Sequence, residues 1–308
     1  LQLDTVTLVI VDRQRDDARP GFAREPRAHH RIEPARQQDD QGVSGNIISS
    51  DLIHWSWYMA YGMVTPASWV AMIANTYMHR FGVTSEHLAE VAIAQRNFAL
   101  NNPAAAGYGK PLTLEEYMNS KRITERLRIY DCCQETDGAV ALLITSTERA
   151  RDLKHKPAVI RGVTQASTRG QEQMTSFYRE ELDRLPEMEL AARRVYDMSG
   201  LGPDDIDAAC LYDAFTPEVI MQLESFGFCK RGEAKDFVAA GNLRQGGRLP
   251  NNTHGGLLSE SYIHGINNIA EGARLIRGTS CNQPERVEHV LVSSGVGVPT
   301  GALILGRD

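Results

Sequence analysis

CLYDAFTPEVIMQLESFGF, residues 210–228, places a strand, a polar turn and a helix in immediate succession. The apolar run over residues 206–211 predicts a buried strand, which ends at Tyr212. Thr216 and Pro217 then have the residue types of an N-cap and a first helical residue. Tyr212 is therefore expected at a junction between a strand and a helix.

A second junction lies in NNTHGGLLSESYIHGINN, residues 251–268. Residues 251–256 have the composition of a tight polar turn with two glycines, and a helix is expected from about Tyr262 to Ile276. Tyr262 and His264 then lie near its amino end. Ligands of open α/β sheets bind beyond the carboxyl ends of strands, and helix amino ends favour developing negative charge, so the two junctions are expected to share one pocket.

The motifs YDAF, THGG and SYIHG together resemble the carboxyl half of the thiolase superfamily, in particular the sterol-carrier-type and lipid-transfer thiolases. Degradative thiolases carry Asn or His at the first junction and a Gly-His-Pro motif at the second. In this sequence both polar positions fall on tyrosines, Tyr212 and Tyr262. This departure is similar to the thiolase-like aldolases that cleave steroid side chains as acyl-CoA thioesters.

The resemblance implies an α/β thiolase-like fold, with a mixed sheet layered with helices and a helical loop domain. A complete thiolase has a longer amino-terminal half than this chain matches, so that half is expected to be incomplete. Residues 1–50 are interpreted as a divergent or truncated remnant, in which a shifted reading frame is one explanation of the arginine-rich run. Residues 51–155 are interpreted as the loop domain with its return strand, and residues 156–308 as the carboxyl-terminal α/β half.

The resemblance also assigns the candidate site. The expected catalytic residues are Tyr212 and Tyr262, with His264, His254 and Asp213 as candidates to hold or deprotonate them, and the expected substrate-binding residues are Gly255 and Gly256. Each has a structural alternative: a tyrosine that packs at an element end, a histidine that holds its own turn, or a glycine that lets two backbones approach. Which tyrosine acts as acid and which as base is open.

The expected reaction is retro-aldol cleavage of a β-hydroxyacyl-CoA, in particular a steroid side-chain thioester, to a ketone and a short acyl-CoA such as propionyl-CoA. It needs a base for the hydroxyl proton, donors for the enolate and an acid to protonate it. The final glycine-rich loop, VSSGVGVP, has no cysteine, which argues against acyl-enzyme thiolase chemistry. The alternatives are an acetyl-CoA acyltransferase or lipid-transfer thiolase homologue, a non-catalytic acyl-CoA or lipid-binding protein, and an inactive relic.

Composition sets broader bounds. The net charge of −6 argues against a surface that binds nucleic acid. No apolar run approaches the roughly 18 residues that span a bilayer. The five cysteines lack CxxC spacing and are interpreted as reduced thiols, so a cytoplasmic protein without a metal is expected. No cofactor is expected beyond the coenzyme A of the substrate. The resemblance implies an OB-fold partner domain associated with an acyl-CoA hydratase, and a homodimer where the amino half is present.

The remaining pattern predicts ordinary elements. An opening strand is expected within residues 1–11, followed by an arginine-rich loop over 12–42. Amphipathic helices are expected over 66–82, 85–102 and 114–123, the last with a capping box of Thr113 and Glu116. Strands are expected over 139–144 and from Ala158, a helix ends at Gly200, and a strand pair closes the chain.

Overall fold

The computed structural model describes residues 6–10, 58–169, 177, 179–295 and 300–307. The chain divides into two compact units, one made of Leu1–Val11 with Ala67–Asp308 and the other of Asp12–Pro66. The described part of the second unit holds the short 3-10 helix η2 (Met59–Tyr61). The first unit carries the sheet and the candidate site. The arginine-rich segment expected to be a loop lies outside the described residues, and the domain boundaries expected from the sequence stay a prediction.

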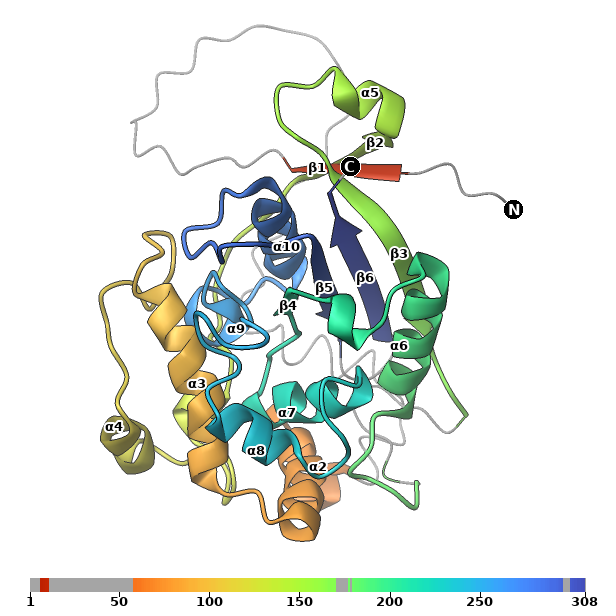
Figure 1. Ribbon diagram of the computed structural model, residues 1–308. Coiled ribbons are helices and arrows are strands. Elements are labelled where there is room, and N and C mark those ends of the chain that lie inside the picture. Colours follow the sequence, from red (N-terminus) through yellow and green to blue (C-terminus); the bar gives the residue numbers. More distant parts are fainter. Residues whose placement is uncertain (1–5, 11–57, 170–176, 178, 296–299, 308) are drawn as a thin grey trace, which may run out of the picture. The chain divides into compact units, whose positions relative to one another are not determined.

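A six-stranded mixed sheet forms the centre of the first unit (Figure 1). Its strands follow the order β2-β1-β3-β6-β5-β4, in which β4 and β5 are parallel and all other neighbours are antiparallel. The strands are β1 (Val6–Ile10), β2 (Leu142–Ser146), β3 (Ala158–Ala166), β4 (Ala208–Cys210), β5 (His289–Ser294) and β6 (Thr300–Gly306). The mixed sheet and the closing strand pair are therefore confirmed.

Helices cover both faces of this sheet. On β5, Leu291 belongs to the apolar cluster that contains α6 (Pro186–Ser199) and α7 (Thr216–Ser225), whereas Val290 and Val292 pack with α10 (Ile266–Arg277). Alternate residues of a strand point to opposite faces, so α10 lies on one face and α6 with α7 on the other. Gly272 lets α10 approach closely, because a Cβ there would lie 2.8 Å from Val292 Cγ2.

The segment before β2 is helical, as the amphipathic pattern predicts. It contains α2 (Pro66–Phe81), α3 (Ser85–Ala99), α4 (Leu114–Asn119) and η3 (Ile129–Asp131), and α5 (Thr147–Arg151) follows β2. The predicted capping box of α4 is present: Glu116 N donates to Thr113 Oγ1 at 3.1 Å, and Thr113 N donates to Glu116 Oε2 at 2.8 Å. The remaining elements are η4 (Pro203–Asp205), α8 (Ala234–Ala239) and α9 (Gly256–Ser259).

Both junctions differ in detail from the sequence-based prediction. Thr216 is the first residue of α7 rather than its N-cap, which is Phe215, and the Thr216 hydroxyl donates to buried Asp131 at 2.6 Å. At the second junction α10 begins at Ile266, so Tyr262 and His264 precede the helix. His264 (φ +49°) and Gly265 (φ +80°) have left-handed backbone angles, which a helix from Tyr262 cannot contain.

Candidate active site

Two tyrosines from the two junctions meet at their hydroxyl groups. Tyr212 follows β4 and Tyr262 lies between α9 and α10, and their Oη atoms are 3.0 Å apart. Tyr212 is buried and Tyr262 is half-buried. The structure thus brings together the two residues that the sequence placed first.

The backbone of Tyr212 is held by a closed ring of hydrogen bonds. Tyr212 N donates to Ser293 Oγ at 2.9 Å, Ser293 Oγ donates to Gln222 Oε1 at 2.6 Å, and Gln222 Nε2 donates to the Tyr212 carbonyl at 2.6 Å. Ser293 lies on β5 and Gln222 on α7, and both side chains are buried. Tyr212 is therefore fixed to the sheet and to the helix at the same time. We call Gln222 and Ser293 the Tyr212 clip.

Tyr262 is held from the segment before β2. Its backbone N–H donates to Thr136 Oγ1 at 2.6 Å, and residue 135 forms a β-bridge with residue 262. Its hydroxyl lies 3.2 Å from His264 Nδ1, and the two rings stack with centroids 4.7 Å apart. Tyr212, Tyr262 and His264 thus form a continuous line of hydrogen bonds.

Burial keeps both phenols protonated. Loss of hydration raises the pKa of Tyr212 far above its usual value, with a further contribution from the neighbouring Tyr262. The pKa of Tyr262 is raised by burial as well, but the hydrogen bond from Tyr212 partly lowers it. The bond between the two hydroxyls thus raises the pKa of Tyr212 and lowers that of Tyr262. Of the two hydroxyls, that of Tyr262 loses its proton more readily.

Glu218 is a buried acid beside this pair. It lies in the first turn of α7, it is 3% exposed, and its Oε2 has no hydrogen-bond partner. Burial raises its pKa well above the usual range, and the ionised form of Glu218 raises the pKa values of Tyr212 and Tyr262. Nothing in the residue pattern singles it out, because a glutamate in the first turn of a helix is ordinary capping chemistry.

Asp213 faces away from the hydroxyl pair and toward α9. Its Oδ2 accepts hydrogen bonds from Leu257 N at 2.8 Å and Leu258 N at 3.2 Å, and its Oδ1 has no partner. Burial raises the pKa of Asp213 to about 6, although the two N–H donors oppose that shift. The contacts are those of a residue that fixes the first turn of α9.

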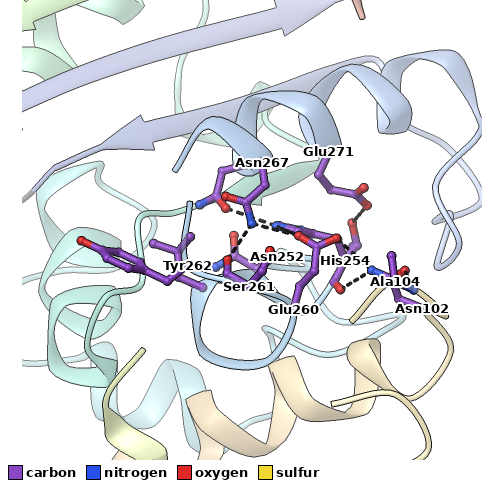
Figure 2. Close-up of polar contacts among 12 residues, drawn as sticks. Asn102, Ala104, Asn252, His254, Glu260, Ser261, Tyr262, Asn267 and Glu271 are labelled. Atoms are coloured by element: carbon purple, nitrogen blue, oxygen red, sulfur yellow. Dashed lines mark hydrogen bonds and ion pairs between the residues drawn. The ribbon is translucent and has the colours of Figure 1, made fainter. Parts of the chain in front are cut away.

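His254 belongs to a separate polar cluster. Its Nε2 lies 3.2 Å from Asn268 Oδ1 and 3.5 Å from Glu260 Oε2, and its Nδ1 has no partner. Asn102 and Asn267 both donate to the Glu260 carboxylate. Figure 2 shows the ring of Tyr262 directed away from this cluster, so the structure does not bring His254 together with the tyrosine hydroxyls.

Gly255 and Gly256 have left-handed backbones in a crowded turn. A Cβ on Gly255 would lie 2.8 Å from Ala99 Cβ, and one on Gly256 would lie 2.2 Å from Asp213 Oδ2. The close approach that these glycines allow is therefore to α3 and to Asp213. A contact of their backbone with substrate stays a prediction.

The five cysteines are all free thiols, as the sequence indicated. Cys133 is close to the site, since its N–H donates to the Ala214 carbonyl at 2.8 Å. Burial raises the pKa of Cys132 to about 12 and that of Cys133 further, so neither is a ready thiolate at neutral pH. The chemistry that the described site supports is hydroxyl-based.

Comparisons with known proteins agree with this geometry. Residues 169–307 match a family model described as Thiolase C-terminal domain-like. The steroid side-chain-cleaving aldolase of Thermomonospora curvata is 55% identical over 89% of this chain and 68% of its own length. The 17-hydroxy-3-oxo-4-pregnene-20-carboxyl-CoA lyase of Mycobacterium tuberculosis is 57% identical over 80% of this chain and 64% of its own length. A solved structure described as Ltp2-ChsH2(DUF35) aldolase is 56% identical, with a TM-score of 0.83 over 84% of this chain and 68% of that one.

The chain belongs to the thiolase superfamily. Within it, the chain belongs to the branch of thiolase-like aldolases, and the expected fold class and family are confirmed. The chain spans 68% and 64% of the two curated relatives just described.

None of the helices in the described ranges combines the length and the apolarity that a bilayer crossing requires.

Proposed function

We propose that the protein is a retro-aldolase that cleaves a β-hydroxyacyl-CoA into a ketone and a shorter acyl-CoA. The observation that carries the proposal is the pair of hydroxyl groups, Tyr212 Oη and Tyr262 Oη, held 3.0 Å apart at the junctions after β4 and before α10. Both relatives named above are described as enzymes that break a steroid side chain or a carboxyl-CoA compound of that class. We extend that substrate class, with propionyl-CoA as the short product, to this chain.

Two protonated phenols suit this reaction. Cleavage turns the β-hydroxyl into a carbonyl and leaves an enolate on the thioester, and a phenol both accepts a hydrogen bond from the hydroxyl and donates one to an enolate oxygen. The Tyr212 clip fixes one phenol against the sheet, so its position does not depend on the substrate. Preorganised donors of this kind stabilise developing charge without a reorganisation cost.

An acyltransferase or a carrier of acyl-CoA is the competing proposal. Acyl transfer by a thiolase needs a thiolate nucleophile, and burial raises the pKa values of all five free thiols. A carrier needs no line of hydrogen-bonded acids and bases. The hydroxyl pair with His264 beside it therefore favours catalysis over binding alone.

Partners and location complete the proposal. The solved relative is described as Ltp2-ChsH2(DUF35) aldolase, a description that holds two names. We propose an OB-fold partner domain associated with an acyl-CoA hydratase, together with a homodimer. The substrate supplies coenzyme A and no other cofactor is proposed. A cytoplasmic location is consistent with the five free thiols.

The test uses the chain with and without a candidate OB-fold partner. A tertiary β-hydroxyacyl-CoA is supplied, ketone and shorter thioester are measured by mass spectrometry, and acetoacetyl-CoA thiolysis is followed in parallel. We expect cleavage without thiolysis. Thiolysis alone would favour the acyltransferase, and binding of the thioester by folded protein without either reaction would favour the carrier.

A further inference from the structure

Three titratable side chains form a line from the interior to the surface. Tyr212 is buried, Tyr262 is half-buried and His264 is exposed. The Tyr212 and Tyr262 oxygens are 3.0 Å apart, and the Tyr262 oxygen is 3.2 Å from His264 Nδ1. Both are distances over which a proton moves between hydrogen-bonded groups.

The backbone at the outer end of this line is strained in a way that aims the histidine. His264 has φ +49°, a left-handed angle that is uncommon for any residue other than glycine. Gly265 follows with φ +80°, and a Cβ there would lie 3.0 Å from Tyr212 Cδ2. The strained turn therefore packs on the Tyr212 ring and directs the imidazole back onto Tyr262, and such strain persists where the structure has a use for it.

We propose that His264 is the terminal proton acceptor of a relay that begins at Tyr212 and passes through Tyr262. The inference rests on the proposed retro-aldol function and adds to it the order of the tyrosines and the group that holds the proton. Tyr212 contacts the substrate hydroxyl, and Tyr262 connects it to the imidazole. His264 acts through Tyr262, and it does not touch the substrate.

The proton balance of the relay is closed. The substrate O–H bond breaks, and its proton goes to Tyr212 while the Tyr212 proton goes to Tyr262 and the Tyr262 proton goes to His264 Nδ1. The O–H electron pair becomes the carbonyl of the ketone, and the pair of the broken carbon–carbon bond becomes the enolate. The proton on the imidazolium returns along the same line, and Tyr212 delivers its own proton to the enolate carbon.

The relay explains how a tyrosine with a raised pKa can accept the proton of the substrate hydroxyl. Burial raises the pKa values of both phenols, so a free tyrosinate is costly at neutral pH. A neutral imidazole at the exposed end removes the need for one.

Other titratable groups face this line from two parts of the chain. They are Cys133 and Glu135 from the segment before β2 and Glu218 on α7, whereas Asp213 is turned toward α9. Burial raises the pKa values of Cys133 and Glu218, so neither is readily ionised. Glu135 contacts Tyr262 through the backbone bridge.

The kinetic test compares His264→Asn with wild type in the complete complex. Asparagine tolerates a left-handed backbone and can still accept a hydrogen bond from Tyr262, but it cannot take up the proton. We expect kcat to fall on the order of 10²-fold with KM little changed. The pH profile of kcat should also change on its acid side, because only wild type has an imidazole in the relay. The matched control is His79→Asn, an exposed histidine on α2.

Chemical rescue separates proton transfer from support of the fold. His264→Gly keeps the left-handed backbone and leaves an exposed space, so added imidazole should restore activity at least 10-fold, with little effect on wild type. A wild-type rate in His264→Asn would overturn the relay. So would equal losses of kcat in His264→Asn and His264→Gly without a response of His264→Gly to imidazole. Cleavage by wild type and its loss in Tyr212→Phe would still uphold the retro-aldolase.

A readout without turnover tests the same assignment. Nitrogen-15 NMR of the resting protein should show the neutral His264 ring with its proton on Nε2, because Nδ1 must accept from Tyr262. A proton on Nδ1 would overturn the relay whether or not a substrate has been found. Tyr262→Phe should shift the His264 Nδ1 resonance, and Tyr61→Phe, at an exposed ring, should not.

Discussion

Tyr212 and Tyr262 are 50 positions apart in the sequence, yet their hydroxyl oxygens lie 3.0 Å apart. Tyr212 follows strand β4, and Tyr262 lies in the connection between helices α9 and α10. The contact between their hydroxyls therefore depends on the positions of all three elements. Burial raises the pKa of each phenol, and the two hydroxyls share one hydrogen bond. The pair therefore behaves as one polar unit, and removal of either oxygen alters both.

The first prediction concerns that unit. Tyr212→Phe and Tyr262→Phe should each lower kcat for cleavage by about 10²- to 10⁴-fold, the range for loss of a positioned acid or base. Each change keeps the ring and removes only the oxygen, so thermal unfolding should change little. Steady-state kinetics with a β-hydroxyacyl-CoA checks the rate. Tyr108→Phe, at a half-exposed ring, is the control, and full activity of either site variant would contradict the assigned role.

The Tyr212 clip supplies a second prediction. Ser293→Ala leaves the Tyr212 N–H and the Gln222 carbonyl oxygen without their partner in a buried site, which costs about 1–3 kcal/mol in the free energy of unfolding. Released from β5, Tyr212 should also lose its position, so kcat should fall by more than the stability loss explains.

Urea denaturation and kinetics measure the two effects of the clip. Ser225→Ala is the matched control, since the Ser225 hydroxyl bonds only to the Met221 carbonyl of its own helix. Equal effects of the two serine changes on kcat would count against the clip as a positioning device.

The sequence predicted the fold well because its elements have local signals. Pro66 begins α2, Thr113 and Glu116 cap α4, and Gly200 ends α6 with a left-handed backbone, all as the pattern indicated. The boundaries failed where a contact far away in the sequence decides them. Thr216 has the right residue type for a cap, but its hydroxyl bonds to Asp131, and the helix starts one residue earlier than expected.

The site was predicted in part, for a related reason. Tyr212 and Tyr262 were found through their position at junctions and through family resemblance. Gln222 and Ser293 were missed because neither residue type nor spacing shows that α7 and β5 meet behind Tyr212. His254 was grouped with the tyrosines because it lies in the second junction with Tyr262, whereas its turn directs it into the network of Glu260 and Asn268.

Asp213 gives a prediction about pH and stability. Its pKa rises from 3.8 to about 6 on folding, so the folded state prefers the protonated acid. Above the unfolded value the unfolded carboxyl ionises first, and stability falls between about pH 4 and 6. By linkage the loss reaches about 3 kcal/mol above that window. Asp213→Asn cannot ionise, so its unfolding free energy should fall less than that of wild type as pH rises through this window.

The measurement is urea denaturation of both proteins at several pH values. The difference between them isolates Asp213 from other carboxyl groups, such as Asp183, whose pKa is lowered by its arginine partners against the effect of burial. A constant difference from pH 4 to pH 7 would show that Asp213 is not the group responsible.

The turn that carries Gly256 provides the last prediction. Gly256 has φ +64°, and a Cβ there would lie 2.2 Å from Asp213 Oδ2, so Gly256→Ala must both strain the backbone and displace the carboxylate that holds α9. Gly278 has φ +74° with nothing within 4 Å of such a Cβ, so Gly278→Ala measures the backbone cost alone, about 1–2 kcal/mol. Gly256→Ala should cost at least about 2 kcal/mol more, because a buried hydrogen-bonded carboxylate has to move. Denaturation of the two variants side by side checks this, and equal losses would mean that the contact between Gly256 and Asp213 is not tight enough to matter.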